Sequence, residues 1–293
     1  MRALMWSVGG LVAVVGAIWL ATEILPDATA WILLQQRAYQ GDIAEAVRAL
    51  QGGAPGAWLT LIVATGGYGL IHAAGPGHGK YLIGGTGLAS DVSAKALLSL
   101  AVLSSLLQAA WAVVLVYGGF WIFGLIAPQV TDLAETVLAP ASYAAIAAIG
   151  GVFAYRGAKG LWRVTQPVPQ TTCGCGHAHG PSAEEVARLT GWRDAVPLVL
   201  SVAIRPCTGA IFLLVIAWQL DLALAGIVGV AAMGLGTAIL TSGVAVSSVA
   251  ARGLALLSSG GTGQLSLVAP ALQIAAGVVI AVISLSLLRA ALG

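Results

Sequence analysis

The sequence contains very few charged residues: Asp, Glu, Lys and Arg make up 8% of its 293 residues, whereas an ordinary soluble domain has about 25%. Hydrophobic residues make up 59%, so too little polar surface remains to cover a soluble core. This shortage excludes a soluble enzyme, a nucleic-acid-binding domain and a disordered chain. The net charge of +2 is too small to indicate a polyanionic partner. We therefore expect an all-α integral membrane protein whose surroundings are the lipid bilayer.

Sequence motifs of several enzyme classes are also missing. No Walker A motif occurs, which excludes ATP hydrolysis by this chain. Neither H-E-x-x-H nor G-x-S-x-G occurs, which argues against an intramembrane protease. The three cysteines are too few for a disulfide framework. The chain is therefore not expected to be an enzyme.

Long uncharged runs predict about seven transmembrane helices. A helix needs about 20 apolar residues to cross the hydrocarbon core, and these runs show no alternation that would suit a β-barrel. The predicted spans are residues 3–22, 57–74, 97–124, 137–157, 196–218, 222–248 and 268–289.

The first span has an alternative interpretation as a signal peptide. Arg2 precedes its apolar core, and Ala28-Thr29-Ala30 has the form of a cleavage site. Its apolar stretch is longer than that of a usual signal peptide, so we favour a retained N-terminal helix within residues 1–25.

The spans divide the chain into five segments and orient it. After residues 1–25, a segment at 26–56 is either an amphipathic helix at the outer interface or a simple connector. Residues 57–162 and 196–293 form two blocks of three spans, separated by a Cys- and His-containing loop at 163–195. One side of the membrane holds nine Lys and Arg residues and the other three. The richer side, with this loop, is therefore cytoplasmic in a bacterial inner membrane, and the C-terminus lies outside.

Two motifs interrupt the predicted spans: Gly75-Pro76-Gly77 and Arg205-Pro206-Cys207. Proline removes a helical hydrogen bond and glycine lowers helix propensity. Irregular backbone is tolerated in a membrane only where it is buried in protein or lines a wet cavity. Each motif lies early in its block, and blocks of three spans in series have opposite orientations. We therefore expect a 3+3 inverted repeat whose broken helices meet at a central site.

Two histidines, His72 and His78, flank the first break. On a straight helix, residues six apart point about 120° away from each other, but unwinding would let both rings converge on one ion. Imidazole suits Ni²⁺, Co²⁺, Zn²⁺ and Cu²⁺. The alternative is that both rings lie inert at the cytoplasmic interface; we favour metal ligands because the pair surrounds a break. Lys80 is expected to anchor the chain at the cytoplasmic headgroups.

Other polar residues are candidates for a pathway or for metal capture, although such side chains often only bond to nearby backbone. The possible pathway or accessory residues are Cys207, Arg205, Gln108, Ser104, Ser105, Thr237 and Thr241. The loop offers four soft-metal ligands that could collect an ion transiently: Cys173, Cys175, His177 and His179.

The segment 72–80 gives the chain a family resemblance. It matches H-x-x-x-P-G-H-x-K, and in this signature the chain resembles NicO-type nickel/cobalt transporters, the group that includes RcnA-like efflux proteins. The resemblance continues through a basic aromatic stretch at 155–163 and through Pro206-Cys207. It implies metal binding by His72 and His78.

The resemblance also implies a secondary transporter that moves Ni²⁺ or Co²⁺ across the inner membrane by efflux, with the ion as substrate and no permanently bound cofactor. Two departures are visible: the loop is not the long His-rich one of RcnA-like exporters, and Gln108 stands where many relatives have a histidine. Metal uptake and a metal-free, amino-acid-type exporter are the alternatives. A thiol-redox carrier would need two cysteines at membrane depth, where only Cys207 lies.

Overall fold

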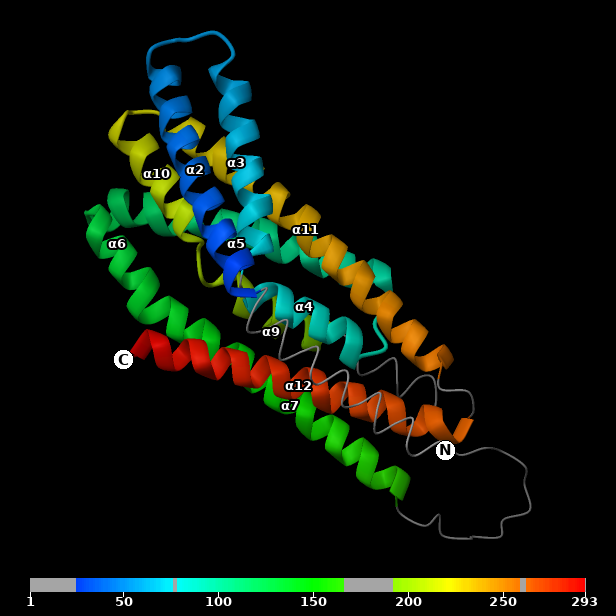
Figure 1. Cartoon of the computed structure of the whole chain (residues 1–293). Helices are drawn as coiled ribbons and strands as arrows, with labels where there is room; N and C mark the ends of the chain where they lie inside the picture. The colour runs from blue at the N-terminus through cyan, green and yellow to red at the C-terminus, as the bar shows by residue number, and fades with distance from the viewer. Residues whose placement is uncertain (1–24, 76–77, 166–191, 259–261, 293) are drawn as a thin grey trace.

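The computed structural model describes residues 25–75, 78–165, 192–258 and 262–292, and every regular element in these ranges is helical. Figure 1 shows two groups of long helices with shorter helices between them. In chain order the elements are α2 (Leu25–Gln51), α3 (Ala57–Ala74), α4 (His78–Ala89), α5 (Ala94–Phe123), α6 (Ala127–Leu133), the π-helical turn η2 (Ala134–Leu138), α7 (Ala139–Thr165), α9 (Trp192–Ala203), α10 (Thr208–Gln219), α11 (Ala223–Ser258) and α12 (Thr262–Leu292).

Several of these helices have the length and composition of membrane spans. Five stretches qualify within the described residues: Ala57–Ala74, Ala94–Phe123, Ala127–Trp162, Ala223–Leu257 and Leu267–Leu292. The pair α9 and α10 adds a sixth if it is counted as one span bent by 55°. The spans predicted from residue 57 onward each overlap one of these stretches, which confirms that the described part of the chain is helical and rich in membrane-type helices. The predicted span 3–22 lies outside the described residues.

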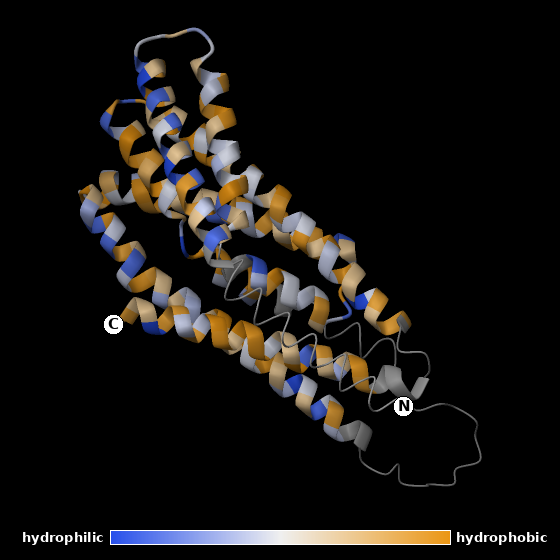
Figure 2. Cartoon of the chain, in the orientation of Figure 1, coloured by the Kyte–Doolittle hydropathy of each residue, from blue (hydrophilic) through white to orange (hydrophobic). Residues whose placement is uncertain are grey.

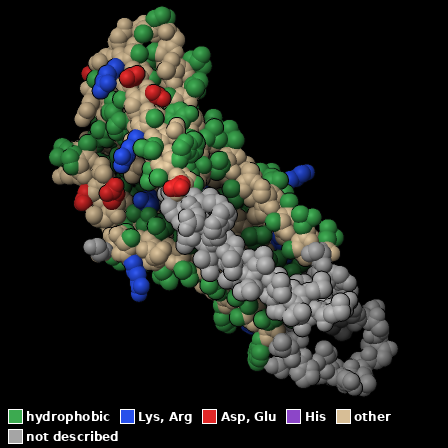
Figure 3. Space-filling model, viewed as in Figure 1, with side chains coloured by type: hydrophobic (Ala, Val, Ile, Leu, Met, Phe, Trp, Pro, Cys, Tyr) green, Lys and Arg blue, Asp and Glu red, His purple; other side chains and the backbone are tan. Residues whose placement is uncertain are grey.

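Large apolar side chains cover the outside of the long helices. Trp121, Leu235 and Val282 have exposed fractions of 82%, 54% and 59%. The hydropathy colouring of Figure 2 and the space-filling view of Figure 3 show apolar residues along most of the helices. A soluble monomer rarely exposes apolar surface on this scale, so this exterior fits a lipid environment.

Helix α2 covers most of the segment 26–56, for which an amphipathic helix was one of two expectations. It packs against α3, and Ile43, Ala46 and Val47 are almost completely buried there. Trp31 and Leu34 on the same helix are exposed. The spacing of the buried residues is that of one helical face. Its position at the outer membrane interface stays a prediction.

Buried residues form two main clusters. One joins α2, α3, α5, α10 and α11 around residues such as Tyr68 and Leu213. The other joins α4, α7, α9 and α12 around residues such as Leu82 and Ile280. In Figure 1 the short helices α4 and α9 lie between the two groups of long helices.

Glycines bring α3 and α11 into direct backbone contact. A Cβ added at Gly69 would lie 2.1 Å from the backbone oxygen of Met233, and one added at Gly236 would lie 2.1 Å from that of Gly66. Only glycine allows helices to approach this closely. Because the two helices are so close, the hydroxyl of Thr237 donates to the Gly69 carbonyl at 3.2 Å. This contact sets the register of α11 against the last turn of α3, which carries His72.

Candidate functional site

Both helix breaks predicted from the sequence are confirmed. Helix α3 ends at Ala74 and α4 begins at His78, while α9 ends at Ala203 and α10 begins at Thr208. On the α3 side of the first break, the amide of Gly75 donates to the carbonyls of Ile71 and His72 at 3.1 and 3.2 Å and so forms the last hydrogen bonds of α3. The interruptions therefore lie where proline and glycine remove helical hydrogen bonds.

Lys80 contacts the end of α3 through its ammonium, and its expected role as a headgroup anchor stays a prediction. Its ammonium donates to the carbonyl of Ala74 at 2.7 Å and to that of Gly75, and the side chain is half-buried. The chain continues into α4, whose side packs on α11 and α12. A cation at these C-terminal carbonyls also complements the helix dipole of α3. Lys80 thus fastens the start of α4 to the end of α3 across the break.

His72 lies in the last turn of α3, where its ring contacts an aromatic side chain while one ring nitrogen has no hydrogen-bond partner among the described residues. Its ring stacks on Tyr68, with centroids 5.7 Å apart and an interplanar angle of 11°. Its Nδ1 atom is buried, and no hydrogen-bond partner for it lies among the described residues. Buried polar atoms are nearly always paired, so this nitrogen needs an explanation. The side chain of its predicted companion, His78, lies outside the described part of the chain.

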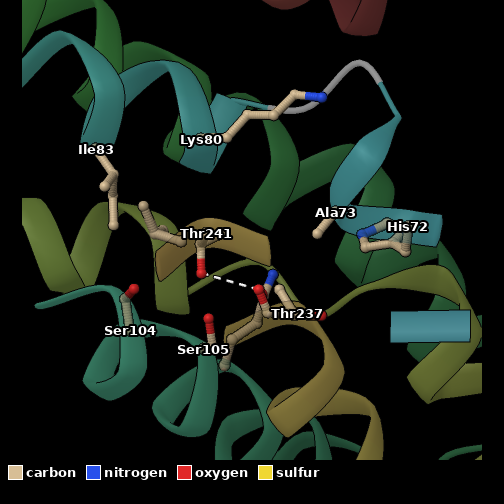
Figure 4. A pocket seen from close by; sticks show the side chains of 10 residues that line it. His72, Ala73, Lys80, Ile83, Ser104, Ser105, Thr237 and Thr241 are labelled. Atoms are coloured by element: carbon tan, nitrogen blue, oxygen red, sulfur yellow. Dashed lines mark hydrogen bonds between the residues drawn. The ribbon is translucent and has the colours of Figure 1, made fainter. Parts of the chain in front are cut away.

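A cavity of about 70 Å³ opens beside His72. Its volume exceeds the roughly 10–15 Å³ that one water needs on the same measure. Five helices contribute its walls, and Figure 4 shows α4 and α5 facing each other across it. The lining residues are His72 and Ala73 of α3, Lys80 and Ile83 of α4, Ser104, Ser105 and Gln108 of α5, Val202 of α9, and Thr237 and Thr241 of α11.

The cavity hydroxyls have their protons committed to backbone. Ser105 donates to the Ala101 carbonyl at 2.9 Å, and Thr241 donates to that of Thr237 at 2.9 Å, the dashed line in Figure 4. Ser104 and Thr237 donate in the same way to their own helices. A hydroxyl that donates to a carbonyl keeps oxygen lone pairs for another partner. The cavity therefore combines an unpaired imidazole nitrogen with oxygen atoms able to face a cation or its waters.

The structure thus places around one cavity several polar residues that the sequence suggested separately. All five polar candidates from the predicted spans 97–124 and 222–248 line the His72 cavity. The hydrophobic wall residues Ile83 and Val202, and the stacking partner Tyr68, were not anticipated, because nothing in their local sequence distinguishes them from ordinary packing residues.

The second helix break contacts a residue of the His72 cavity through a backbone carbonyl. Gln108 donates its side-chain amide to the Arg205 carbonyl at 2.7 Å. The Arg205 guanidinium itself bonds to the Tyr143 hydroxyl and lies 5.0 Å from the centre of that ring. The charge of Arg205 is therefore held against α7, and Arg205 is not one of the described residues lining the His72 cavity.

Cys207 begins α10 as its N-cap, with its sulfur accepting from the Ala210 amide at 3.3 Å. It lines a separate cavity of about 10 Å³ next to the first. No group of three or more His, Cys, Asp or Glu side chains suited to a metal ion occurs among the described residues. The four loop candidates Cys173, Cys175, His177 and His179 lie outside that part of the chain.

A search of curated proteins finds a relative in Haemophilus influenzae. The chain is 31% identical to it over 257 residues, which is 80% of this chain and 80% of the relative. That protein carries the name "Putative nickel/cobalt efflux system". No family model and no solved structure matches the chain.

Proposed function

The chain belongs to the family of nickel/cobalt efflux proteins of the NicO type, and from this premise we propose that it exports Ni²⁺ or Co²⁺ through the His72 cavity. The cell membrane it crosses is the inner membrane of a bacterium, with the loop 163–195 on the cytoplasmic side. The ion is cargo, and the chain acts as a secondary transporter.

The observation that carries this proposal is the buried, unpaired Nδ1 of His72 beside a polar cavity at a helix break. An imidazole nitrogen without a hydrogen-bond partner is available as a ligand for Ni²⁺ or Co²⁺. Hydroxyl oxygens of Ser105 and Thr237, or waters on them, supply further donors. His78, the first residue of α4, is the second proposed imidazole ligand.

The helix contacts support a 3+3 inverted repeat around this site. The broken pair α3 and α4 packs against α11, the middle helix of the other block, and the broken pair α9 and α10 packs against α5. The middle helices α5 and α11 contact each other, as do the last helices α7 and α12. An exchange of partners between blocks is what a two-fold relation between inverted halves produces. With the span 3–22, the protein crosses the membrane seven times.

The environment of Cys207 argues against a thiol-redox carrier. The sulfur nearest to Cys207 in the described part of the chain is the thioether of Met233, 3.5 Å away. A thioether has no thiol to exchange and cannot form a disulfide, so this pair cannot carry electrons by thiol–disulfide exchange.

The test is metal flux in vesicles of known orientation. Wild type is compared with His72→Ala and His78→Ala, and Zn²⁺ and a neutral amino acid serve as control cargoes. Ser286→Ala is the matched control, because its exposed hydroxyl on α12 only bonds to the Ile283 carbonyl. We expect each histidine variant to lower Ni²⁺ and Co²⁺ flux by at least about tenfold, as loss of a metal contact commonly does.

The direction of flux in the same vesicles separates export from uptake. Unchanged metal flux in both histidine variants would refute the assignment of the site. Flux of the amino acid without flux of metal would favour the small-solute exporter instead.

A further inference from the structure

Two sulfur atoms meet next to the His72 cavity. The Sγ atom of Cys207, at the start of α10, lies 3.5 Å from the Sδ atom of Met233, on α11. In the described ranges 25–75, 78–165, 192–258 and 262–292, these are the one cysteine and the one methionine. The fold therefore brings together the sulfur atoms of two residues 26 positions apart.

The separation of the two sulfurs suits joint coordination of one ion. Metal–sulfur bonds in tetrahedral protein sites are about 2.3 Å long, and two such bonds to one ion subtend about 100° when the sulfurs are 3.5 Å apart. The sulfurs can therefore accept an ion by small shifts of side chains, without a change in helix register. Met233 is 2% exposed, so a site here is shielded from water.

The sulfur pair lies next to the histidine cavity. The cavity of about 10 Å³ that Cys207 and Met233 line shares three wall residues with the His72 cavity: Ser105, Gln108 and Thr237. One layer of polar side chains thus separates the imidazole from the sulfurs. The smaller cavity is closed to anything larger than a water in this conformation, so passage requires movement of that layer.

We propose that Cys207 and Met233 form a second coordination station for the transported ion, beyond His72 on the α10 side. This inference rests on the proposed transport function. Thiolate and thioether ligands bind soft and borderline ions, whereas Mg²⁺, Ca²⁺ and Mn²⁺ favour oxygen. The station adds sulfur ligands to the His72 imidazole and so strengthens the selection of Ni²⁺ and Co²⁺ against the abundant hard cations.

Spectroscopy of the purified full-length protein tests the site independently of transport. Co²⁺ is added to a Cys173→Ser/Cys175→Ser background, which removes the loop thiols. Sulfur-to-cobalt charge-transfer absorption is expected in this background and is lost on adding Cys207→Ser. Serine is also a good N-cap, so α10 keeps its start and the variant keeps its fold. Absence of the band before Cys207 is changed, or its survival afterwards, would overturn the proposal.

Flux in vesicles tests the selectivity. We expect Cys207→Ser and Met233→Leu each to lower the ratio of Co²⁺ to Mn²⁺ flux by about tenfold, the scale of effects seen when contacts around a metal are removed. Unchanged ratios in both variants would also overturn it. If His72→Ala abolishes flux while the sulfur variants keep wild-type flux and selectivity, the sulfur station alone fails. If His72→Ala and His78→Ala leave metal flux unchanged, the proposed function fails, while the cobalt spectrum still decides whether the sulfurs bind metal.

Discussion

The contact between α3 and α11 allows a sharp prediction about Gly69. An alanine Cβ at this position would lie 2.1 Å from the Met233 backbone oxygen and 2.9 Å from its carbonyl carbon. Neither atom can rotate away, because both belong to the backbone of a long helix. The two helices must therefore separate by about 1 Å to restore an ordinary van der Waals contact.

The expected cost follows from two opposing effects. Alanine favours a helix over glycine by about 0.5–1 kcal/mol, while overpacking of a tight interface costs about 1–3 kcal/mol. We expect Gly69→Ala to lose about 1–2 kcal/mol of stability net. Separation of the helices also lengthens the bond from Thr237 to the Gly69 carbonyl and shifts one wall of the cavity away from His72. A misplacement of about 1 Å at a reacting site can lower a rate by about 10²-fold. Metal flux should therefore fall by a larger factor than the folding equilibrium constant.

Gly66→Ala is the matched control on the same helix. Its Cβ would lie 3.8 Å from the nearest neighbouring atom, the Ala232 backbone oxygen, which is an ordinary contact. The assays are thermal unfolding in detergent and Ni²⁺ flux in vesicles. Gly66→Ala should match or exceed wild type in both, and Gly69→Ala should fall below it in both. Equal behaviour of the two variants would refute the close-contact argument.

Three further predictions concern charged groups. Lys80→Met should lower the free energy of unfolding by about 2–3 kcal/mol, since it leaves carbonyls at the end of α3 without their charged donor; denaturant titration measures this, and a wild-type midpoint would contradict it. Tyr143→Phe removes the hydroxyl that binds Arg205 but keeps the aromatic ring beneath the guanidinium. It should therefore be less destabilising than Tyr143→Leu, which also loses a cation–π contact of about 1–2 kcal/mol. Equal melting temperatures for the two variants would exclude a role for the ring. Arg252→Ala breaks an ion pair of 2.7 Å with Asp91, a residue whose side chain is 70% exposed, so its effect should stay within about 1 kcal/mol and shrink further in high salt; a larger, salt-independent loss would show that the pair is buried in the membrane-embedded protein.

The helix breaks could be predicted because their cause is local. Pro76 has no amide hydrogen to donate, and the glycines beside it weaken the helix whatever packs around them. The membrane-type helices could be predicted for a similar reason, since a run without charge is a property of the chain alone. Even the polar lining of the cavity was anticipated as a set, because hydroxyl and amide side chains stand out in apolar helices.

Lys80 shows where the local argument ends. In the sequence it follows a break and looks like the cytoplasmic end of a span, but α4 continues for twelve residues and buries Leu82 and Ile83 completely or nearly so. The glycine-rich composition of that stretch gives a weak helical signal, and its helix is stabilised by packing on α11 and α12. The ammonium therefore meets the backbone carbonyls of Ala74 and Gly75, a contact that the sequence did not suggest.

By itself, the sequence determined that this chain is helical and membrane-embedded, that two helices are broken, and that His72 stands at one of the breaks. Only the tertiary structure decided that His72, Ser105 and Thr237 line one cavity, that Lys80 joins the two sides of the break, and that the sulfurs of Cys207 and Met233 touch. The physical reason is that charge-free runs and helix breaks depend on neighbours in the chain, whereas these contacts depend on the rotation and register of packed helices. That register is set by backbone contacts such as the one at Gly69, which no local pattern reveals.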